Sequence, residues 1–282
     1  ATGATWSREA AYKMGQTIAK DCVHHGRQMI LGPGLNMKRN ALCGRNFEYF
    51  SEDPVLTGEM AAAYVKGCEE NGVGTSMKHY ACNSQENYRT TISSEIDERT
   101  MREIYLRAFE IAAKKGNPAS IMCAYNKINS IWCSENKMLI NDILRNEWGY
   151  EGIMVSDWGA VHDTVRSVKA GMDLRMPRCD STVSEVVDAV NSGKLTEDEV
   201  DRSAARVLEF LMRPVSEDKD YDRDEQHKAA YDVAKEAICL LRNDDNILPL
   251  TAKKYKRIAV TGEYAVKPYI NGQGSAEVFT DE

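Results

Sequence analysis

Residues 150–159 read YEGIMVSDWG, a turn followed by a short apolar run that stops at an acid and an aromatic ring. Ile153, Met154 and Val155 are continuously apolar, which is typical of a parallel strand covered on both faces. Asp157 follows this strand directly. In barrel enzymes catalytic groups project from the carboxyl ends of the strands, because a strand is rigid and the loop beyond it is open to ligands. The stretch therefore predicts a buried parallel strand with a candidate catalytic acid at its end.

Apolar strands alternate with amphipathic helices on both sides of this stretch. Further strands are predicted at 28–31, 75–79, 120–124 and 172–176. Helices are predicted at 7–26, 57–71, 101–116, 136–148, from about 160, and after a capping box at 196–199. This alternation favours parallel βαβ units. The predicted fold class is α/β: a (β/α)8-type (TIM-like) barrel that is missing its first strand, followed by the start of a second α/β sandwich domain. An open doubly wound sheet is the alternative.

Composition suggests three segments. Residues 1–213 are predicted to form the (β/α)8-type catalytic barrel, and the polar, highly charged residues 214–225 a linker. Residues 226–282 are predicted to begin the α/β sandwich domain, with one helix and a buried strand from Ile258 to Thr261. So short a segment does not complete such a domain, so we expect further sequence to finish it.

Overall composition narrows the function classes. Hydrophobic residues make up 43% and charged residues 28% of the 282 residues, an ordinary soluble balance. The net charge of −7 argues against nucleic acid and suits a neutral ligand. No apolar run approaches the roughly 20 residues of a membrane span. Eight scattered cysteines without a CxxC pair favour buried, reduced thiols and a cytoplasmic location, with two or more disulfides as the alternative.

Other side chains that follow or end predicted strands are candidates for binding a sugar. They are Arg45, Lys78, His79, Arg89, Tyr125 and Trp158. Cationic groups donate hydrogen bonds to hydroxyls, and aromatic faces stack on the apolar faces of sugar rings. Taken singly, each has an ordinary explanation: a salt bridge to Glu48 or Glu52 for Arg45 and to Glu86 for Arg89, a solvated charge for Lys78, and a core position for the others. Asp157 has one too, because Ser156 or Asp157 could cap a helix that follows.

Metal and nucleotide chemistry lack support in the sequence. Cys22, His24 and His25 lie on a predicted amphipathic helix, with no second ligand pair at metal spacing. There is no GxGxxG after a strand and no Walker sequence. The sequence therefore predicts no metal site and gives no support for a nucleotide cofactor.

Several segments together resemble glycoside hydrolase family 3, most closely its bacterial and fungal β-glucosidases. They read GRNFEYFSEDP (44–54), KHYACNSQE (78–86), MCAYN (122–126) and VSDWG (155–159). The segments LLRN (240–243) and LPL (248–250) are similar to the beginning of the family's second domain. The resemblance covers nearly the whole chain and keeps the order of the family's motifs.

The resemblance implies a retaining exo-β-glucosidase that hydrolyses terminal non-reducing β-D-glucosyl residues through a covalent glycosyl-aspartate. Asp157 would be the nucleophile. The substrate-binding residues would be Arg45, Lys78, His79 and Arg89 as donors, with Met122, Tyr125 and Trp158 lining the pocket. The implied partners are a small β-glucoside or oligosaccharide and the remainder of the second domain, in the same polypeptide or a companion chain. A homo-oligomer is compatible with this, and neither nucleic acid nor a membrane is expected.

The sequence departs from the family pattern at several points. The first barrel strand, with its Asp-Gly-Pro acid, is expected before Ala1, and the acid/base Glu outside this chain, after Glu282. Arg175 stands where many members carry an acid. The segment GQGS (272–275) is similar to a glycine-rich loop near the family's active site.

Other functions remain open at this point. Within the family, a β-xylosidase or α-arabinofuranosidase is the alternative, whereas the YACN at 80–83 disfavours the N-acetylglucosaminidase branch. A non-catalytic carbohydrate-binding chain is an alternative of another class. A barrel lyase that forms a Schiff base through Lys78 is a third.

Overall fold

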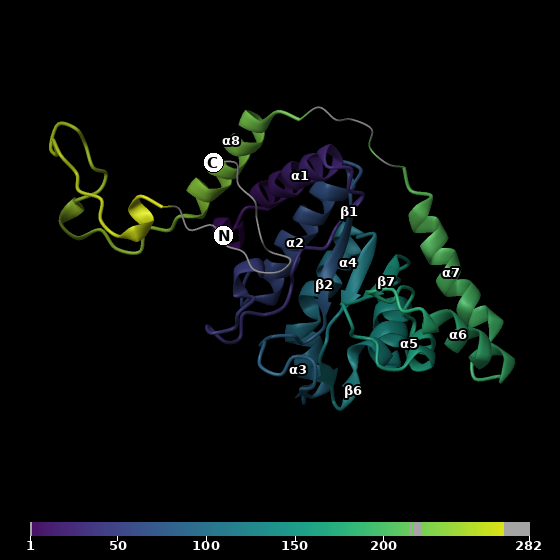
Figure 1. Cartoon of the computed structure of the whole chain (residues 1–282). Helices are drawn as coiled ribbons and strands as arrows, with labels where there is room; N and C mark the ends of the chain where they lie inside the picture. Colours follow the sequence, from purple (N-terminus) through teal and green to yellow (C-terminus); the bar gives the residue numbers. More distant parts are fainter. Residues whose placement is uncertain (1, 215, 217–220, 268–282) are drawn as a thin grey trace. The chain divides into compact units, whose positions relative to one another are not determined.

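The computed structural model describes residues 2–214, 216 and 221–267 (Figure 1). The chain divides into two compact units, Ala1–Cys239 and Leu240–Glu282. Among the described residues, every named strand and all the α-helices lie in the first unit. That unit therefore carries the fold that positions the site.

A four-stranded parallel sheet forms the centre of the first unit, in the order β1-β2-β4-β7. Its strands are β1 (Met29–Ile30), β2 (Gly74–Tyr80), β4 (Ser120–Cys123) and β7 (Ile153–Ser156). A small second sheet joins β3 (Ser93–Ser94), β5 (Lys127–Ile128) and β6 (Ile131–Trp132). The four strands confirm the predictions made for these segments and give a parallel α/β fold.

Helices precede, connect and follow the parallel strands. They are α1 (Arg8–His24), α2 (Pro54–Glu69), α3 (Glu98–Thr100), the π-helix η3 (Met101–Tyr105), α4 (Arg107–Gly116), the π-helix η5 (Met138–Glu147), α5 (Thr164–Ala170), α6 (Ser181–Asn191), α7 (Glu197–Leu211) and α8 (Arg223–Ala237). Short 3₁₀ turns are η1 (Thr2–Thr5), η2 (Asn46–Glu48) and η4 (Cys133–Glu135). The capping box of Thr196 and Glu199 is confirmed, and Ser7 and Asp53 cap α1 and α2.

Two expectations around β7 were wrong. The helix expected from about residue 160 is α5, which begins at Thr164 because Asp163 caps it. The strand predicted at 172–176 is reduced to one bridge between Leu174 and Val155. The reason is that the Met154 N–H donates to the Asp173 carboxylate, 2.7 Å away, and not to a backbone carbonyl. In addition, α6 was not predicted.

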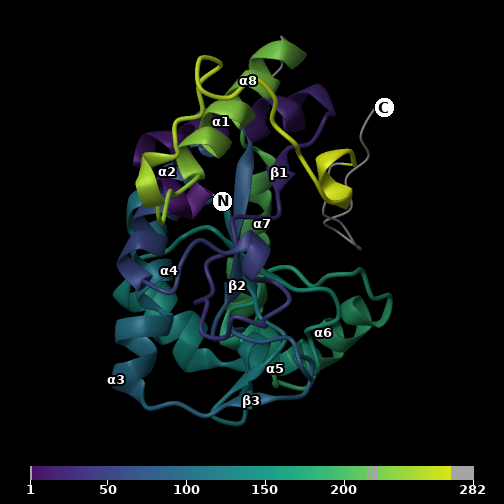
Figure 2. The same ribbon diagram turned by 90° about the vertical axis from the view of Figure 1, so that its left-hand side faces the viewer.

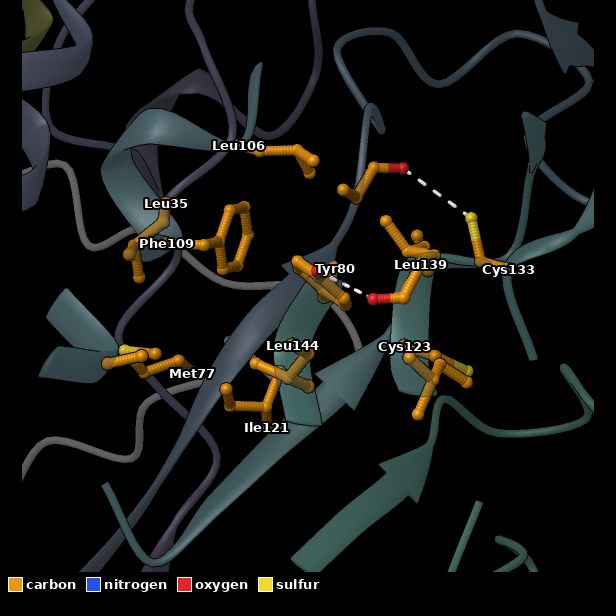
Figure 3. Close-up of a cluster of buried hydrophobic side chains, with 14 of the residues drawn as sticks. Leu35, Met77, Tyr80, Leu106, Phe109, Ile121, Cys123, Cys133, Leu139 and Leu144 are labelled. Carbon is orange, nitrogen blue, oxygen red and sulfur yellow. Dashed lines mark hydrogen bonds between the residues drawn. The ribbon is translucent and has the colours of Figure 1, made fainter. Parts of the chain in front are cut away.

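The main core lies between one face of the sheet and the helices α2, α4 and η5. Met77, Ile121 and Met154 are register partners on adjacent strands, and all three are buried. Tyr80 packs edge-to-face against Phe109 and donates a hydrogen bond to the Leu139 carbonyl at 2.9 Å (Figure 3). This face is therefore closed by apolar side chains, and a site must lie on the other face.

Helix α1 packs on α2, as Figures 1 and 2 both show. Gly15 and Gly67 permit the close approach, because a Cβ on either would lie 2.2 or 2.1 Å from a backbone oxygen of the opposite helix. The Cys68 thiol donates to the Gly15 carbonyl at 3.2 Å across the same contact. Six of the eight cysteines, Cys68 among them, are buried.

Side chains alternate between the two faces of a strand, so Ser120 and Met122 of β4 lie on the face away from the helices. Their partners on β7 are Ile153 and Val155. Two residues further on, Asp157 continues this face beyond the carboxyl end of β7. The parallel strands thus bring the loops after β1, β2, β4 and β7 to one edge.

Helix α8 belongs to the first unit. Its Ala229 and Val233 are buried, and Glu225 pairs with Lys20 of α1 at 3.1 Å. The domain limits predicted at residues 213 and 225 stay predictions.

The described part of the second unit contains two short turns, η6 (Asp244–Asn246) and η7 (Glu263–Ala265). The strand predicted from Ile258 to Thr261 was wrong, since these residues are irregular and largely exposed. Within the part of this unit that the structure describes, there is no strand for them to pair with. The segment at 272–275 lies outside the described residues. No helix in the described ranges is long and apolar enough to cross a membrane.

Candidate active site

Asp157 lies at the carboxyl end of β7 and is only 7% exposed. Its Oδ1 accepts a hydrogen bond from the Trp158 N–H at 2.7 Å. Its Oδ2 is buried and has no hydrogen-bond partner among the described residues. Because α5 is capped by Asp163, Asp157 is not a helix cap. One oxygen is therefore fixed, and the other keeps its lone pairs for a ligand.

His79 lies near the end of β2, with its ring beside Asp157. The His79 side chain is 1% exposed, and its Nε2 lies 3.6 Å from Asp157 Oδ2. Its Nδ1 lies 3.3 Å from Asn36 Oδ1 and 3.4 Å from the Tyr49 hydroxyl. Both nitrogens of the ring therefore face polar groups inside the site.

The electrostatic surroundings keep His79 neutral. Burial holds the pKa of His79 well below its usual range, and the positive charges of Arg45, Lys78 and Arg89 lower it further. A neutral imidazole offers one donor and one acceptor, so it can orient a hydroxyl group without attracting an anion.

We expect this buried histidine to make the protein less stable in acid. The unfolded chain takes up a proton on His79 below about pH 6.5, whereas the folded state does not. Protonation of His79 therefore does not affect the free energy of unfolding above that pH, and it lowers this free energy by up to about 1.4 kcal/mol per pH unit below it. Urea unfolding between pH 7.5 and 5.0 should therefore show a shallower decline for His79→Gln than for the wild type. Equal slopes would show that His79 protonates normally in the folded protein.

Glu48 of η2 joins two of the predicted binding residues. Arg45 Nε donates to Glu48 Oε1, and Lys78 Nζ lies 3.1 Å from Glu48 Oε2. Both cations are largely buried. The salt bridge foreseen as the ordinary explanation for Arg45 is thus present. It also fixes two cationic groups near the end of β2.

Arg89 is held in a similar way on the loop after β2. Its Nη1 donates to Glu86 Oε2 at 2.7 Å, and Asn83 Nδ2 donates to Glu86 Oε1 at 3.2 Å. The guanidinium also lies over the Tyr125 ring, 4.8 Å from its centroid. Burial and the neighbouring charge of Asp157 raise the pKa of Tyr125 to about 12. The loops after β2 and β4 therefore meet beside Asp157.

Two further predicted residues line this edge differently. Met122 of β4 is buried and pairs in register with Val155 of β7. Trp158 follows the acid and is 44% exposed. A half-exposed indole keeps surface for a ligand, whereas Met122 is covered by its neighbours.

The charges of this edge are balanced. Arg45, Lys78 and Arg89 contribute three cations, and Glu48, Glu86 and Asp157 contribute three carboxylates. Directional donors without net charge are suited to a neutral, hydroxyl-rich ligand. In the part of the chain that the structure describes, no group of three His, Cys, Asp or Glu side chains could hold a metal ion.

Sequence reasoning missed four contributors to the site. Glu48 and Glu86 were considered only as salt-bridge partners, and Asn36 and Tyr49 were not singled out. The signal for the two glutamates was their spacing, because Glu48 follows Arg45 by three residues and Glu86 precedes Arg89 by three. Nothing in the local sequence around Asn36 pointed to His79, which is 43 residues away.

Arg175 lies outside this cluster of contacts. Its Nη1 donates to the Thr164 and Thr182 hydroxyls at 3.0 and 3.3 Å. It lines an apolar cavity of about 450 Å³ between α5, α6 and α7.

The parallel sheet, with charged and aromatic residues gathered where its strands end, defines an α/β protein with a candidate ligand site at the carboxyl edge of its sheet. The chain belongs to glycosyl hydrolase family 3. Residues 1–210 match the family model described as Glycosyl hydrolase family 3 N terminal domain, and residues 238–281 match that of the C-terminal domain. The resemblance and the fold class predicted from sequence are therefore confirmed, since the N-terminal domain of this family is a TIM-like (β/α)8 barrel.

Known relatives cover the whole chain. It is 45% identical to the thermostable beta-glucosidase B of Acetivibrio thermocellus, over 97% of this chain and 37% of the relative. It is 42% identical to an exo-alpha-(1->6)-L-arabinopyranosidase of Bifidobacterium breve, over 97% and 38%. The crystal structure of DesR, a beta-glucosidase from Streptomyces venezuelae in complex with D-glucose, superposes with a TM-score of 0.92 at 35% identity, over 99% and 38%. The chain thus spans little more than a third of these relatives.

Proposed function

We propose that this chain provides the nucleophile and the sugar-binding groups of a retaining exo-β-glucosidase that releases terminal non-reducing β-D-glucosyl residues. The observation that carries the proposal is the buried, unpartnered Oδ2 of Asp157, next to His79 at the carboxyl edge of the sheet. The two named beta-glucosidases among the relatives support it.

The proposed reaction has two steps. Asp157 Oδ2 attacks the anomeric carbon, a carbon–oxygen bond forms, and the bond to the aglycone oxygen breaks as that oxygen takes a proton from a general acid. Water then attacks the anomeric carbon and gives its proton to the same group, the bond between that carbon and Asp157 Oδ2 breaks, and the free carboxylate and the sugar with retained configuration result. We assign the general acid to no residue of this chain and propose a Glu of the C-terminal domain.

The remaining residues would bind and orient the glycone. Glu48 fixes Arg45 and Lys78, and Glu86 fixes Arg89, so these donors lose little conformational freedom when a sugar binds. Donors fixed in advance can also stabilise charge that develops in the transition state. We assign His79 to a sugar hydroxyl, and Met122, Tyr125 and Trp158 to the walls of the subsite.

The proposed partners follow from the same assignment. They are a β-glucoside or small oligosaccharide and the C-terminal domain, of which residues 238–281 match the beginning. We also propose a cytoplasmic location, supported by the six buried cysteines, and leave a homo-oligomer open.

A panel of p-nitrophenyl glycosides tests the substrate class. For the intact protein that contains this chain, we expect kcat/KM to be at least about tenfold higher for the β-D-glucoside than for the β-D-xyloside or the α-L-arabinopyranoside. The α-D-glucoside serves as the negative control. A preference for the xyloside or the arabinopyranoside would overturn the assignment of glucose as the glycone. The Bifidobacterium breve relative makes the arabinopyranoside a specific alternative. Glucose binding without turnover of any glycoside would favour a non-catalytic binding chain.

A further inference from the structure

Asn36 forms an unusual set of contacts with His79. Its side chain is buried, with the residue 2% exposed. Its Oδ1 accepts from the His79 backbone N–H at 2.9 Å, and its Nδ2 donates to the His79 backbone carbonyl at 2.9 Å. One amide side chain therefore satisfies both backbone polar groups of a single residue.

This pairing takes the place of the backbone hydrogen bonds that a regular strand would make to its neighbour. The register between β2 and β4 shifts between Met77 and Tyr80, so His79 lies where the ladder is irregular. Buried backbone groups that lose their ladder partners need replacements. An amide supplies one donor and one acceptor at the required separation, whereas a carboxylate supplies only acceptors and alanine supplies neither.

The same amide also determines the state of the imidazole. Because Nδ2 of Asn36 donates to the His79 carbonyl, the atom that faces His79 Nδ1 at 3.3 Å is an oxygen that can only accept. The contact is attractive only if Nδ1 carries the ring proton. The Tyr49 hydroxyl, 3.4 Å from Nδ1, can turn a lone pair toward the same proton, so it is compatible with this tautomer. The Nε2 atom is then an acceptor and cannot donate to Asp157 Oδ2, and their separation of 3.6 Å, longer than a hydrogen bond, agrees with this.

We propose that Asn36 is a positioning residue that keeps the His79 proton on Nδ1, so that Nε2 accepts a hydrogen bond from one glycone hydroxyl and Asp157 Oδ2 stays free to attack. This inference rests on the proposed glycosidase function. It assigns Asn36 no contact with the substrate. It also makes His79 an acceptor for the sugar, while Arg45, Lys78 and Arg89 act as donors.

A double-mutant cycle with monodeoxy substrates tests the proposal in the intact protein. We expect Asn36→Ala and His79→Ala each to lower kcat/KM for the β-glucoside by about 30- to 300-fold, and the double variant to be little worse than either single one. The kcat/KM of each variant is then compared with that of the wild type on the 2-, 3-, 4- and 6-deoxy-β-glucosides. Both single variants should match the wild type on the same deoxy sugar, the one that lacks the hydroxyl bound by His79. A general loss of structure would lower activity equally on all four.

Asn129 offers a matched control. Its side chain makes the same two-bond pairing, at 2.9 Å each, with the backbone of Ile96. Asn129 is exposed, so Asn129→Ala should cost less stability than Asn36→Ala because water can replace the lost bonds, and it should leave the deoxy-sugar pattern of the wild type unchanged. If Asn36→Ala does not fold, Asn36→Asp provides the second variant: it keeps the acceptors for the His79 N–H and for Nδ1 and loses only the donor to the His79 carbonyl, so we expect it to keep the wild-type deoxy pattern, and a changed pattern would contradict the proposal.

The outcomes separate this inference from the function on which it rests. A wild type that hydrolyses none of the glycosides would overturn the proposed function. If the wild type is active, two results would overturn only the role of Asn36. One is that the losses in kcat/KM of Asn36→Ala and His79→Ala add up in the double variant. The other is that the two variants match the wild type on different deoxy sugars. The ¹⁵N chemical shifts of the His79 ring add a readout independent of activity: we expect a protonated Nδ1 in the wild type and a shift of the proton toward Nε2 in Asn36→Ala, and an unchanged tautomer would contradict the proposal.

Discussion

Replacing Asp157 with alanine is expected to lower kcat/KM for an aryl β-glucoside by at least about four orders of magnitude, because no covalent intermediate can then form. Binding of glucose should change by less than about tenfold, since the donors Arg45, Lys78 and Arg89 are held by Glu48 and Glu86 and not by Asp157. Steady-state kinetics and calorimetric titration with glucose measure the two quantities separately.

Asp163→Asn is the matched control for this substitution. Asp163 lies in the same loop and caps α5 by accepting from the Arg166 N–H at 2.9 Å. It should cost little stability, because asparagine caps helices about as well as aspartate, and turnover should be preserved. Azide should partly restore turnover in Asp157→Ala and give the α-glucosyl azide, because the anion enters the space left by the carboxylate. Near-normal activity in Asp157→Ala would remove Asp157 from the mechanism.

The second large effect is expected on stability, at Asp173. This carboxylate is fully buried and lies 2.7 Å from Arg145 Nη2 and 3.1 Å from Arg206 Nη1. It also accepts from the Met154 N–H. Asp173→Ala would leave two guanidinium groups and a strand amide without their partner, and we expect a loss of about 3–5 kcal/mol in the free energy of unfolding. Urea unfolding at pH 7 measures this loss.

The ion pair between Arg178 and Asp180 provides the comparison. Both side chains are more than 90% exposed. Asp180→Ala should therefore leave the unfolding midpoint almost unchanged. A loss at Asp173 no larger than that at Asp180 would mean that the buried network does not hold β7 to η5 and α7.

The sequence predicted the parallel strands well because their signal is local. Continuous apolar runs such as 153–155 are required wherever both faces of a strand are covered. The segment 172–176 looked similar but did not form a full strand, because the side chain of Asp173 takes the place of a backbone partner. No local pattern reveals such a substitution.

The site was predictable where a residue's place depended on a strand end. Asp157, Lys78 and His79 could be placed at one edge because parallel strands share their direction. Asn36 could not be found in this way, since its function depends on a register shift in a strand 43 residues away. The helix start at Thr164 was missed because Ser156, Asp157 and Asp163 are equally good capping residues by type, and only the backbone shows that Asp163 caps the helix.

The most direct test of the central claim is the mass of the intact protein after incubation with an activated 2-deoxy-2-fluoro-β-glucoside. The fluorine slows both steps and the good leaving group speeds the first, so the glycosyl-enzyme accumulates. We predict a mass increase of one fluoroglucosyl group, located by peptide mapping on the peptide that contains Asp157 and absent in Asp157→Ala. A stable adduct on any other residue, or none in a sample that hydrolyses β-glucosides, would contradict the assignment of Asp157 as the nucleophile.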